Sequence, residues 1–67
     1  MDRIAGIDFK ENGPKEVLGW HKQCAITITF EGISYKWSAL GEKGFGYSTD
    51  LSAVRAAKKH IDKNKGD

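Results

Sequence analysis

The feature that most constrains this fold is the segment 24–39, where apolar and polar residues alternate on both sides of Glu31-Gly32. Alternation is the period of a half-buried strand, and a short loop that ends in Gly suits a tight hairpin turn. Folding at that point pairs apolar residues on one face: Phe30 with Ile33, Ile28 with Tyr35, Ile26 with Trp37, and Cys24 with Ala39. A slip of one residue would expose one strand's apolar set, so the sequence predicts a well-determined register.

The opposite face of this hairpin is polar. It places Thr29 beside Ser34, Thr27 beside Lys36, and Ala25 beside Ser38. Threonines and small polar residues are typical of a sheet face in water. The same face could also bind nucleic acid, because a twisted antiparallel sheet can lie in the major groove with hydroxyls and a lysine near phosphates or base edges.

Shorter elements flank the hairpin. We expect a strand at about residues 3–9, with Ala5, Ile7 and Phe9 on one face, then a turn at Asn12-Gly13-Pro14. Val17, Leu18 and Trp20 form either a short strand or a cover for one edge of the core. Residues 41–46 are expected to be a glycine-rich loop that leads into a short strand at about 45–48.

The aromatic residues divide by position. Trp37 and Tyr35 fall on the apolar face of the hairpin, so we predict that they belong to the core and are not stacking platforms for bases. Trp20 lies outside the hairpin between polar residues. It either closes the edge of the core or is an exposed anchor for a partner.

Residues 50–63 have the clearest helical pattern. Ser48, Thr49 and Asp50 are candidate N-caps, whose side-chain oxygens can accept unpaired amide hydrogens. An apolar stripe runs along one side, and a basic ridge runs along the other. The stripe consists of Leu51, Val54, Ala57 and Ile61, widened by Ala53, and the ridge consists of Arg55, Lys59 and Lys63.

Together these elements predict one small α+β domain over residues 1–67. A three- to four-stranded antiparallel sheet, with its hairpin at about 23–39, packs on one C-terminal helix to form two layers. So short a chain has a small core, and its net stability should be a few kcal/mol unless a partner adds to it.

Composition limits the location and the partners. Eleven basic against nine acidic residues leave a net charge of +2, which is compatible with a polyanionic partner but does not require one. The single cysteine excludes an intramolecular disulfide and suits a reducing compartment. No apolar run is long enough to span a membrane, and residues 1–6 lack the apolar segment of a signal peptide. We therefore expect a cytoplasmic protein with no membrane partner.

Catalytic and metal-binding patterns are weak. His21 and Cys24 have a His-x-x-Cys spacing, but zinc needs three or four ligands and the other histidine, His60, lies on the helix. No Ser/His/Asp or Cys/His set can be placed together. The glycine-rich segment 41–46 lacks the Gly-Lys-Ser/Thr ending of a phosphate-binding loop. We expect no enzyme, no metal and no cofactor.

A resemblance to known domains begins at residue 33 and ends at residue 61. The helix opens with a Thr-x-x-x-Ala-x-x-Ala pattern at residues 49–56, after an aromatic hairpin. This stretch resembles the small sheet-plus-helix domains of the AP2 and phage-integrase arm-binding type, and it is similar to short accessory proteins of phages and mobile elements. The resemblance implies a three-stranded sheet followed by a helix, and a DNA-binding role.

Two classes of function stay open. The first is a non-catalytic nucleic-acid-binding accessory protein, which would use Thr27, Thr29 and Lys36 of the sheet and Arg55, Lys59 and Lys63 of the helix. The alternative is a protein-interaction module, such as a phage-encoded inhibitor of a host or defence complex, which would present Trp20, Lys43 and Phe45. A homodimer formed through a sheet edge or the open sheet face is a third possibility.

Overall fold

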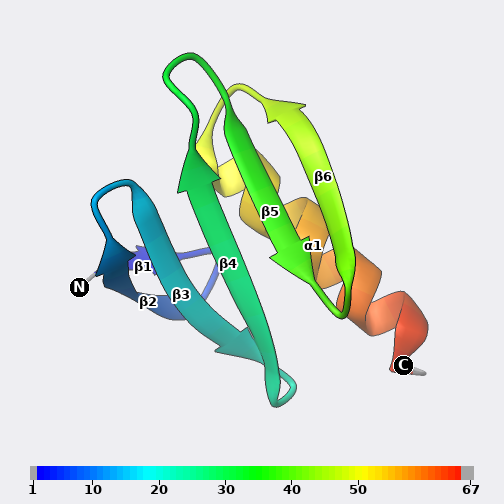
Figure 1. The fold of residues 1–67 in the computed structure, drawn as a ribbon. Helices are drawn as coiled ribbons and strands as arrows, with labels where there is room; N and C mark the ends of the chain where they lie inside the picture. The colour runs from blue at the N-terminus through cyan, green and yellow to red at the C-terminus, as the bar shows by residue number, and fades with distance from the viewer. Residues whose placement is uncertain (1, 66–67) are drawn as a thin grey trace.

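The computed structural model describes residues 2–65 and shows an α+β fold, in which a six-stranded antiparallel sheet carries one C-terminal helix (Figure 1). The strands are β1 (Asp2–Ile4), β2 (Ile7–Gly13), β3 (Glu16–His21), β4 (Cys24–Phe30), β5 (Tyr35–Ala39) and β6 (Glu42–Tyr47), and the helix is α1 (Asp50–Asn64). Strands lie in the order β1-β2-β3-β4-β5-β6, so each pairs with its neighbours in sequence. The predicted fold class is confirmed, but the expectation of three to four strands is wrong.

The extra strands arise from tight turns at positions where the sequence does not predict a turn. Residues 3–9 were expected to form one strand, yet Ala5 (φ 53°) and Gly6 (φ 81°) turn the chain and separate β1 from β2. Lys22 (φ 51°) and Gln23 (φ 66°) do the same between β3 and β4. Positive φ at both central residues is the geometry of a hairpin turn that matches strand twist, but Ala, Lys and Gln seldom adopt it.

Two loops predicted from glycines are partly strand. Asn12 and Gly13 belong to β2, and the turn that follows lies at residues 14–15. The glycine-rich segment is likewise a strand from Glu42 onward, because the turn before it is only Leu40 (φ 51°) and Gly41 (φ 78°). Glycine in a strand often marks a bulge, and the register does shift near Gly13 and again between β5 and β6.

The central hairpin differs from its predicted register by two residues. Phe30 pairs with Tyr35, and Ile28 pairs with Trp37. The loop is therefore residues 31–34, closed by a 2.8 Å hydrogen bond from the Glu31 amide to the Ser34 carbonyl. Ile33 was predicted to be paired and buried, but it is 94% exposed in this loop. A shift of two residues keeps the paired residues of β4 and β5 on their predicted faces, so the apolar and polar faces are retained outside the loop.

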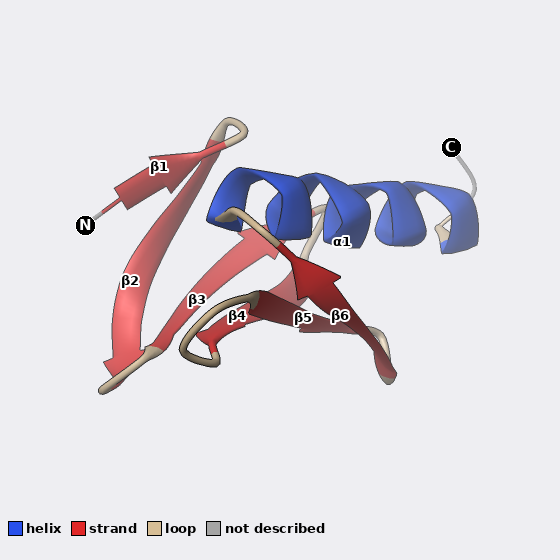
Figure 2. Cartoon of the chain, turned by 90° about the horizontal axis from the view of Figure 1, so that it is seen from above, coloured by secondary structure: helices blue, strands red, loops and turns tan. Residues whose placement is uncertain are grey.

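The helix covers one side of the sheet, which we call the inner face (Figure 2). Its buried side chains are Ala53, Val54, Ala57 and Ile61, and they pack with Ile7, Phe9, Cys24, Ile26, Ile28, Trp37 and Ala39 of the strands. Thr49 caps the helix, since its hydroxyl accepts a 3.1 Å hydrogen bond from the Ser52 amide. Leu51 was expected in the apolar stripe but is exposed, because it precedes the part of the helix that meets the sheet.

Two strand glycines allow the close packing of the inner face. A Cβ on Gly19 would lie 2.6 Å from the Phe9 ring, and one on Gly44 would collide with the Trp37 indole. Trp37 is buried beneath this glycine, as predicted, while Tyr35 is half-buried. Both glycines are therefore required by neighbouring aromatic rings and not by their own backbone angles.

Polar contacts fix the helix against two turns of the sheet. Lys58 Nζ donates a 2.9 Å hydrogen bond to the Ala5 carbonyl, which holds the β1–β2 turn beside the helix. Asp62 Oδ1 lies 2.9 Å from Lys22 Nζ and 2.9 Å from His21 Nε2, next to the β3–β4 turn. The hydrogen bond from Lys22 is the main reason that the pKa of Asp62 is lowered from 3.8, and His21 adds to this effect.

Candidate functional site

The face of β2–β6 that points away from the helix is the candidate site, and we call it the outer face. Side chains alternate along each strand, so the neighbours of the buried Ile26, Ile28 and Trp37 point to this side. Within residues 2–65, no other element packs over it (Figure 1). The outer face consists of Lys10, Glu16, Leu18, Trp20, Ala25, Thr27, Thr29, Lys36, Ser38, Lys43 and Phe45.

A row of direct cross-strand neighbours crosses the middle of the outer face. Thr27 stands opposite Leu18 on one side and Ser38 on the other. Lys10 and Lys43 extend the row at its two ends, opposite Leu18 and Ser38 respectively. The sequence predicted that Thr27 would stand beside Lys36, but in the observed register Lys36 lies opposite Thr29. The row therefore places hydroxyl groups at its centre and an ammonium group at each end.

Lys36 is held by two neighbours. Its Nζ lies 3.4 Å from Glu31 Oε2 in an ion pair, and 6.0 Å from the centroid of the Phe45 ring. A partly exposed ion pair of this kind contributes little free energy, so a phosphate or carboxylate of a ligand can replace Glu31. The position over Phe45 keeps the ammonium group above the outer face.

Two large aromatic side chains are exposed on the outer face. Trp20 is 58% exposed and Phe45 is 64% exposed. Trp20 lies opposite Ala25 near one end of β3, whereas Phe45 lies beside Lys36 on β6. From the spacing and rise of strands, they are roughly 20 Å apart on a diagonal of the sheet.

These aromatics were assigned by sequence to a different surface from the threonines. The structure brings Trp20, Lys43 and Phe45 onto the same face as Thr27, Thr29 and Lys36. The sequence contained one indication of the face on which Trp20 lies. Leu18 and Trp20 are two residues apart, so they share a face of any strand that contains both. The position of Phe45 depends on the register shift between β5 and β6, which the sequence does not show.

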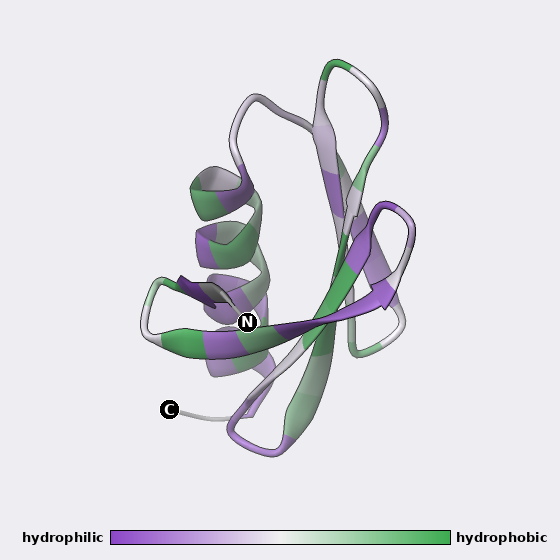
Figure 3. Ribbon diagram, turned by 90° about the vertical axis from the view of Figure 1, so that its left-hand side faces the viewer, coloured by the Kyte–Doolittle hydropathy of each residue, from purple (hydrophilic) through white to green (hydrophobic). Residues whose placement is uncertain are grey.

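The basic ridge of the helix lies elsewhere. Arg55, Lys59 and Lys63 are exposed on the side of α1 opposite its buried residues. Because α1 covers the inner face, the ridge and the outer face are on opposite sides of the molecule (Figure 3). The structure thus separates the two halves of the predicted nucleic-acid surface.

His21 and Cys24, which were considered as metal ligands, lie beside each other in the sheet. They are direct cross-strand partners, with Cys24 buried and His21 next to Asp62. In the described part of the chain, no three His, Cys, Asp or Glu side chains are close enough together to hold a metal ion.

Helix α1, the only helix within residues 2–65, is neither long nor apolar enough to cross a bilayer.

Comparison with known proteins adds no family. No protein-family model, curated protein or solved structure matches this chain. The resemblance of residues 33–61 to AP2 and integrase arm-binding domains therefore stays a prediction, and the function has to be argued from the geometry.

Proposed function

We propose that this protein is a non-catalytic binding module that contacts nucleic acid through its outer face. The observation that supports the proposal best is the presence of two exposed aromatics, Trp20 and Phe45, on one face with lysines and hydroxyls. Nucleic acid offers bases that stack on aromatic rings, and phosphates that pair with ammonium groups and accept hydrogen bonds from hydroxyls.

The arrangement favours single strands over a duplex. Trp20 and Phe45 can stack only on bases that are unpaired and turned toward the sheet. They lie far enough apart for a segment of several nucleotides to cross between them, over Thr27, Ser38 and the neighbouring lysines. A net charge of +2 supports modest affinity with a clear dependence on salt.

The basic ridge on α1 is not part of this proposed interface. A nucleic acid lying on the outer face cannot reach Arg55, Lys59 or Lys63 without wrapping around the molecule, because the sheet and the helix lie between them. We assign the ridge the role of a solvated helix face. This makes its residues useful controls, since they carry the same charge as the lysines of the outer face and are exposed, as Lys10 and Lys43 are.

A protein partner is the second candidate function. Exposed aromatics are also typical anchors of protein interfaces, where Trp and Tyr often supply much of the binding free energy. The same Trp20, Lys43 and Phe45 would then contact a partner protein or a second copy of this chain.

Two further expectations stay predictions. They are a cytoplasmic location, which the single cysteine suggests, and the absence of catalytic activity.

The deciding experiment is a titration of fluorescently labelled single-stranded DNA, single-stranded RNA and duplex DNA at two salt concentrations. We expect single strands to bind best, with an affinity that falls steeply as salt rises, because lysine–phosphate contacts release counterions. Lys36→Glu and Lys43→Glu should each weaken binding and reduce the salt dependence. The matched control is Lys59→Glu, which makes the same charge change on the other side of the molecule.

Three results would count against this function. The proposal fails if no nucleic acid binds at low salt, or if Lys59→Glu weakens binding as much as Lys36→Glu does. A mass that rises with protein concentration, measured by sedimentation without any ligand, would instead favour a homodimer. If Trp20→Ala then restored the monomer, the outer face would be identified as the dimer interface.

A further inference from the structure

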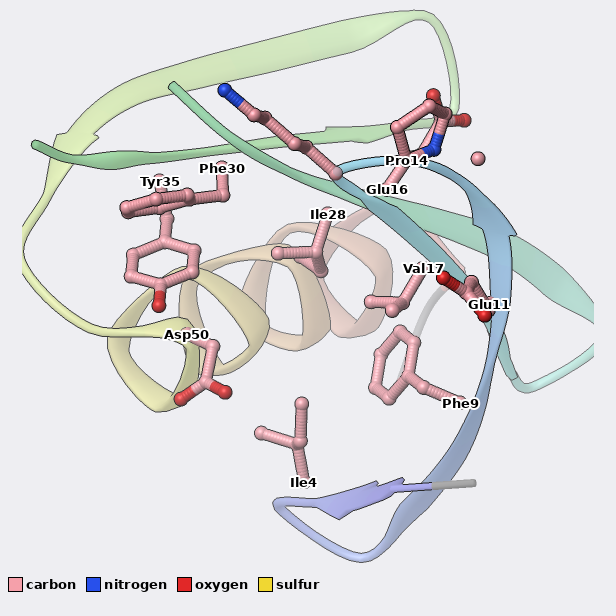
Figure 4. Close-up of a pocket in the computed structure, with 12 residues that line it drawn as sticks. Ile4, Phe9, Glu11, Pro14, Glu16, Val17, Ile28, Phe30, Tyr35 and Asp50 are labelled. Carbon is pink, nitrogen blue, oxygen red and sulfur yellow. The ribbon is translucent and has the colours of Figure 1, made fainter. Parts of the chain in front are cut away.

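A cavity of about 420 Å³ opens at one end of the inner face (Figure 4). It lies beside Asp50, the first residue of α1, and is lined by residues of β2, β3, the end of β4 and the start of β5. The β1–β2 hairpin and the turn at residues 14–15 enclose this end of the inner face. Of the residues that line the cavity, only Glu16 also belongs to the outer face.

The walls of the cavity are mainly apolar. Six large side chains line it: Ile4, Phe9, Val17, Ile28, Phe30 and Tyr35. The Phe30 and Tyr35 rings pack against each other with their centroids 4.9 Å apart. In Figure 4, Tyr35 and Asp50 lie at one side of the cavity and Phe9 and Glu11 at the other, with Ile28 between them. A volume of this size lies within the range of pockets that bind small organic molecules.

The rim of the cavity is acidic. Three acidic residues, Glu11, Glu16 and Asp50, line it together with one basic residue, Lys15. Glu16 accepts a 3.2 Å hydrogen bond from Asn12, but with respect to residues 2–65 none of the three carboxylates forms an ion pair. Asp50 also interacts with the positive end of the helix dipole, which offsets only part of its charge. The potential at the opening is therefore negative.

We propose that this cavity binds a small hydrophobic amine, that is, an aromatic or branched-alkyl group that bears a protonated primary amine. The apolar group would be buried against Phe9, Ile28 and Tyr35, and the ammonium group would stay at the rim, where Asp50 lies on one side of the cavity and Glu11 on the other. An anion of the same shape would face the same apolar walls but would be repelled by the rim. This inference does not depend on the proposed function, because the two sites share only Glu16 and prefer opposite charges.

The test compares three probes of nearly equal shape: phenethylamine, 2-phenylethanol and 3-phenylpropionate. Binding to the full chain is followed by chemical-shift changes of ¹⁵N-labelled amides. We expect the amine to bind about tenfold more tightly than the carboxylate, with the alcohol between them. The shifts should concentrate in β2, the turn at residues 14–15, the ends of β4 and β5 that line the cavity, and the first turn of α1.

Variants separate the charge of the rim from the shape of the cavity. Asp50→Asn and Glu11→Gln should each reduce the preference for the amine, and Val17→Phe should abolish binding of all three probes by filling the cavity. Glu42→Gln is the matched control, since it removes one exposed carboxylate outside the cavity lining. The amide spectrum of each variant shows directly whether the fold is retained.

The inference is overturned if the carboxylate binds as tightly as the amine, or if the shifts map to the outer face. It is also overturned if no amide responds to the amine at its solubility limit. Nucleic-acid binding by the outer face can succeed or fail independently, because Asp50→Asn leaves that face unchanged.

Discussion

The two faces of this sheet use the same strands for opposite purposes. On the inner face, Ile26 is fully buried and Trp37 is packed so tightly that Gly44 cannot accept a side chain. On the outer face, the adjacent residues are hydroxyls and lysines, and the aromatic Trp20 stays 58% exposed. Both faces contain a tryptophan, so residue type alone does not decide the role. What decides it is whether the helix lies over that face.

This contrast separates stability from binding. Side chains of the inner face contribute free energy of folding through burial, whereas exposed aromatics contribute little to folding and are available to a partner. We therefore expect substitutions on the inner face to change the free energy of unfolding. Substitutions on the outer face should change affinity while leaving unfolding nearly unaffected.

The largest difference between the two faces is expected when two adjacent residues of β4 are each replaced by alanine. Ile26→Ala removes a fully buried side chain and should lower the free energy of unfolding by about 2 to 5 kcal/mol, enough to unfold much of so small a domain. Thr27→Ala, one residue along, should cost less than about 1 kcal/mol. Urea denaturation followed by circular dichroism measures both, and equal losses would contradict the division between faces.

A smaller effect is expected where glycine meets tryptophan. Gly44→Ala puts a methyl group where the Trp37 indole lies, and we expect a loss of about 1 to 3 kcal/mol from overpacking. Gly13→Ala is the control, because its Cβ would lie 3.6 Å from Glu16 Cβ, an ordinary contact. Thermal unfolding of the two variants distinguishes them; a Gly44→Ala protein as stable as the parent would show that the indole can move aside.

On the outer face the expected change is in affinity. Trp20→Ala should weaken single-strand binding by roughly 5- to 150-fold, from about 1 to 3 kcal/mol for each stacked base. The free energy of unfolding should change little, since the side chain is mostly exposed. Leu51→Ala removes an exposed apolar side chain on the helix and serves as the control. Similar losses of affinity in both variants would rule out a specific stacking role for Trp20.

The smallest effect concerns pH at the end of the inner face. Because the pKa of Asp62 is lowered on folding, its contribution to stability is present above 3.8 and is lost as pH falls through the lower value of the folded state. The stability difference between the parent and Asp62→Asn should therefore shrink as pH drops below 3.8. Unfolding curves at a series of acidic pH values measure this, and a constant difference would exclude the ionic contact as its source.

Much of the fold could be predicted because it depends on local patterns. Thr49 begins the helix as an N-cap, and Ala53, Val54, Ala57 and Ile61 form its buried side. The alternation in β4 placed Ile26 and Ile28 on one face and the threonines on the other. These predictions succeed because helical and strand periods are properties of the chain itself.

The errors share a different cause. The split at Ala5–Gly6 requires positive φ at an alanine, and the loop at residues 31–34 leaves Ile33 exposed where a shorter loop would have paired it. Local sequence preference favours neither the positive φ at Ala5 nor the exposure of Ile33. Strand pairing and helix packing offset the small unfavourable free energy of both features.

The candidate site was predictable only in pieces. The sequence identified Thr27, Thr29 and Lys36 as one polar face, and it offered Trp20 and Phe45 as contacts for a protein partner in the alternative function. Their union on one face depends on the pairing of β3 with β4 and on the register shift before Phe45. The acidic cavity had no sequence signal, because its lining comes from segments that lie far apart in the chain.

The sequence by itself determined the class of fold, the C-terminal helix, and on which face of the sheet the residues of β4 and β5 lie, since these follow from the periodicity of apolar residues over a few positions. Only the tertiary structure decided that there are six strands, that the helix ridge lies away from the outer face, and that the helix leaves a cavity uncovered. These features depend on where segments distant in sequence pack together, and there side-chain volume and strand pairing outweigh local preference.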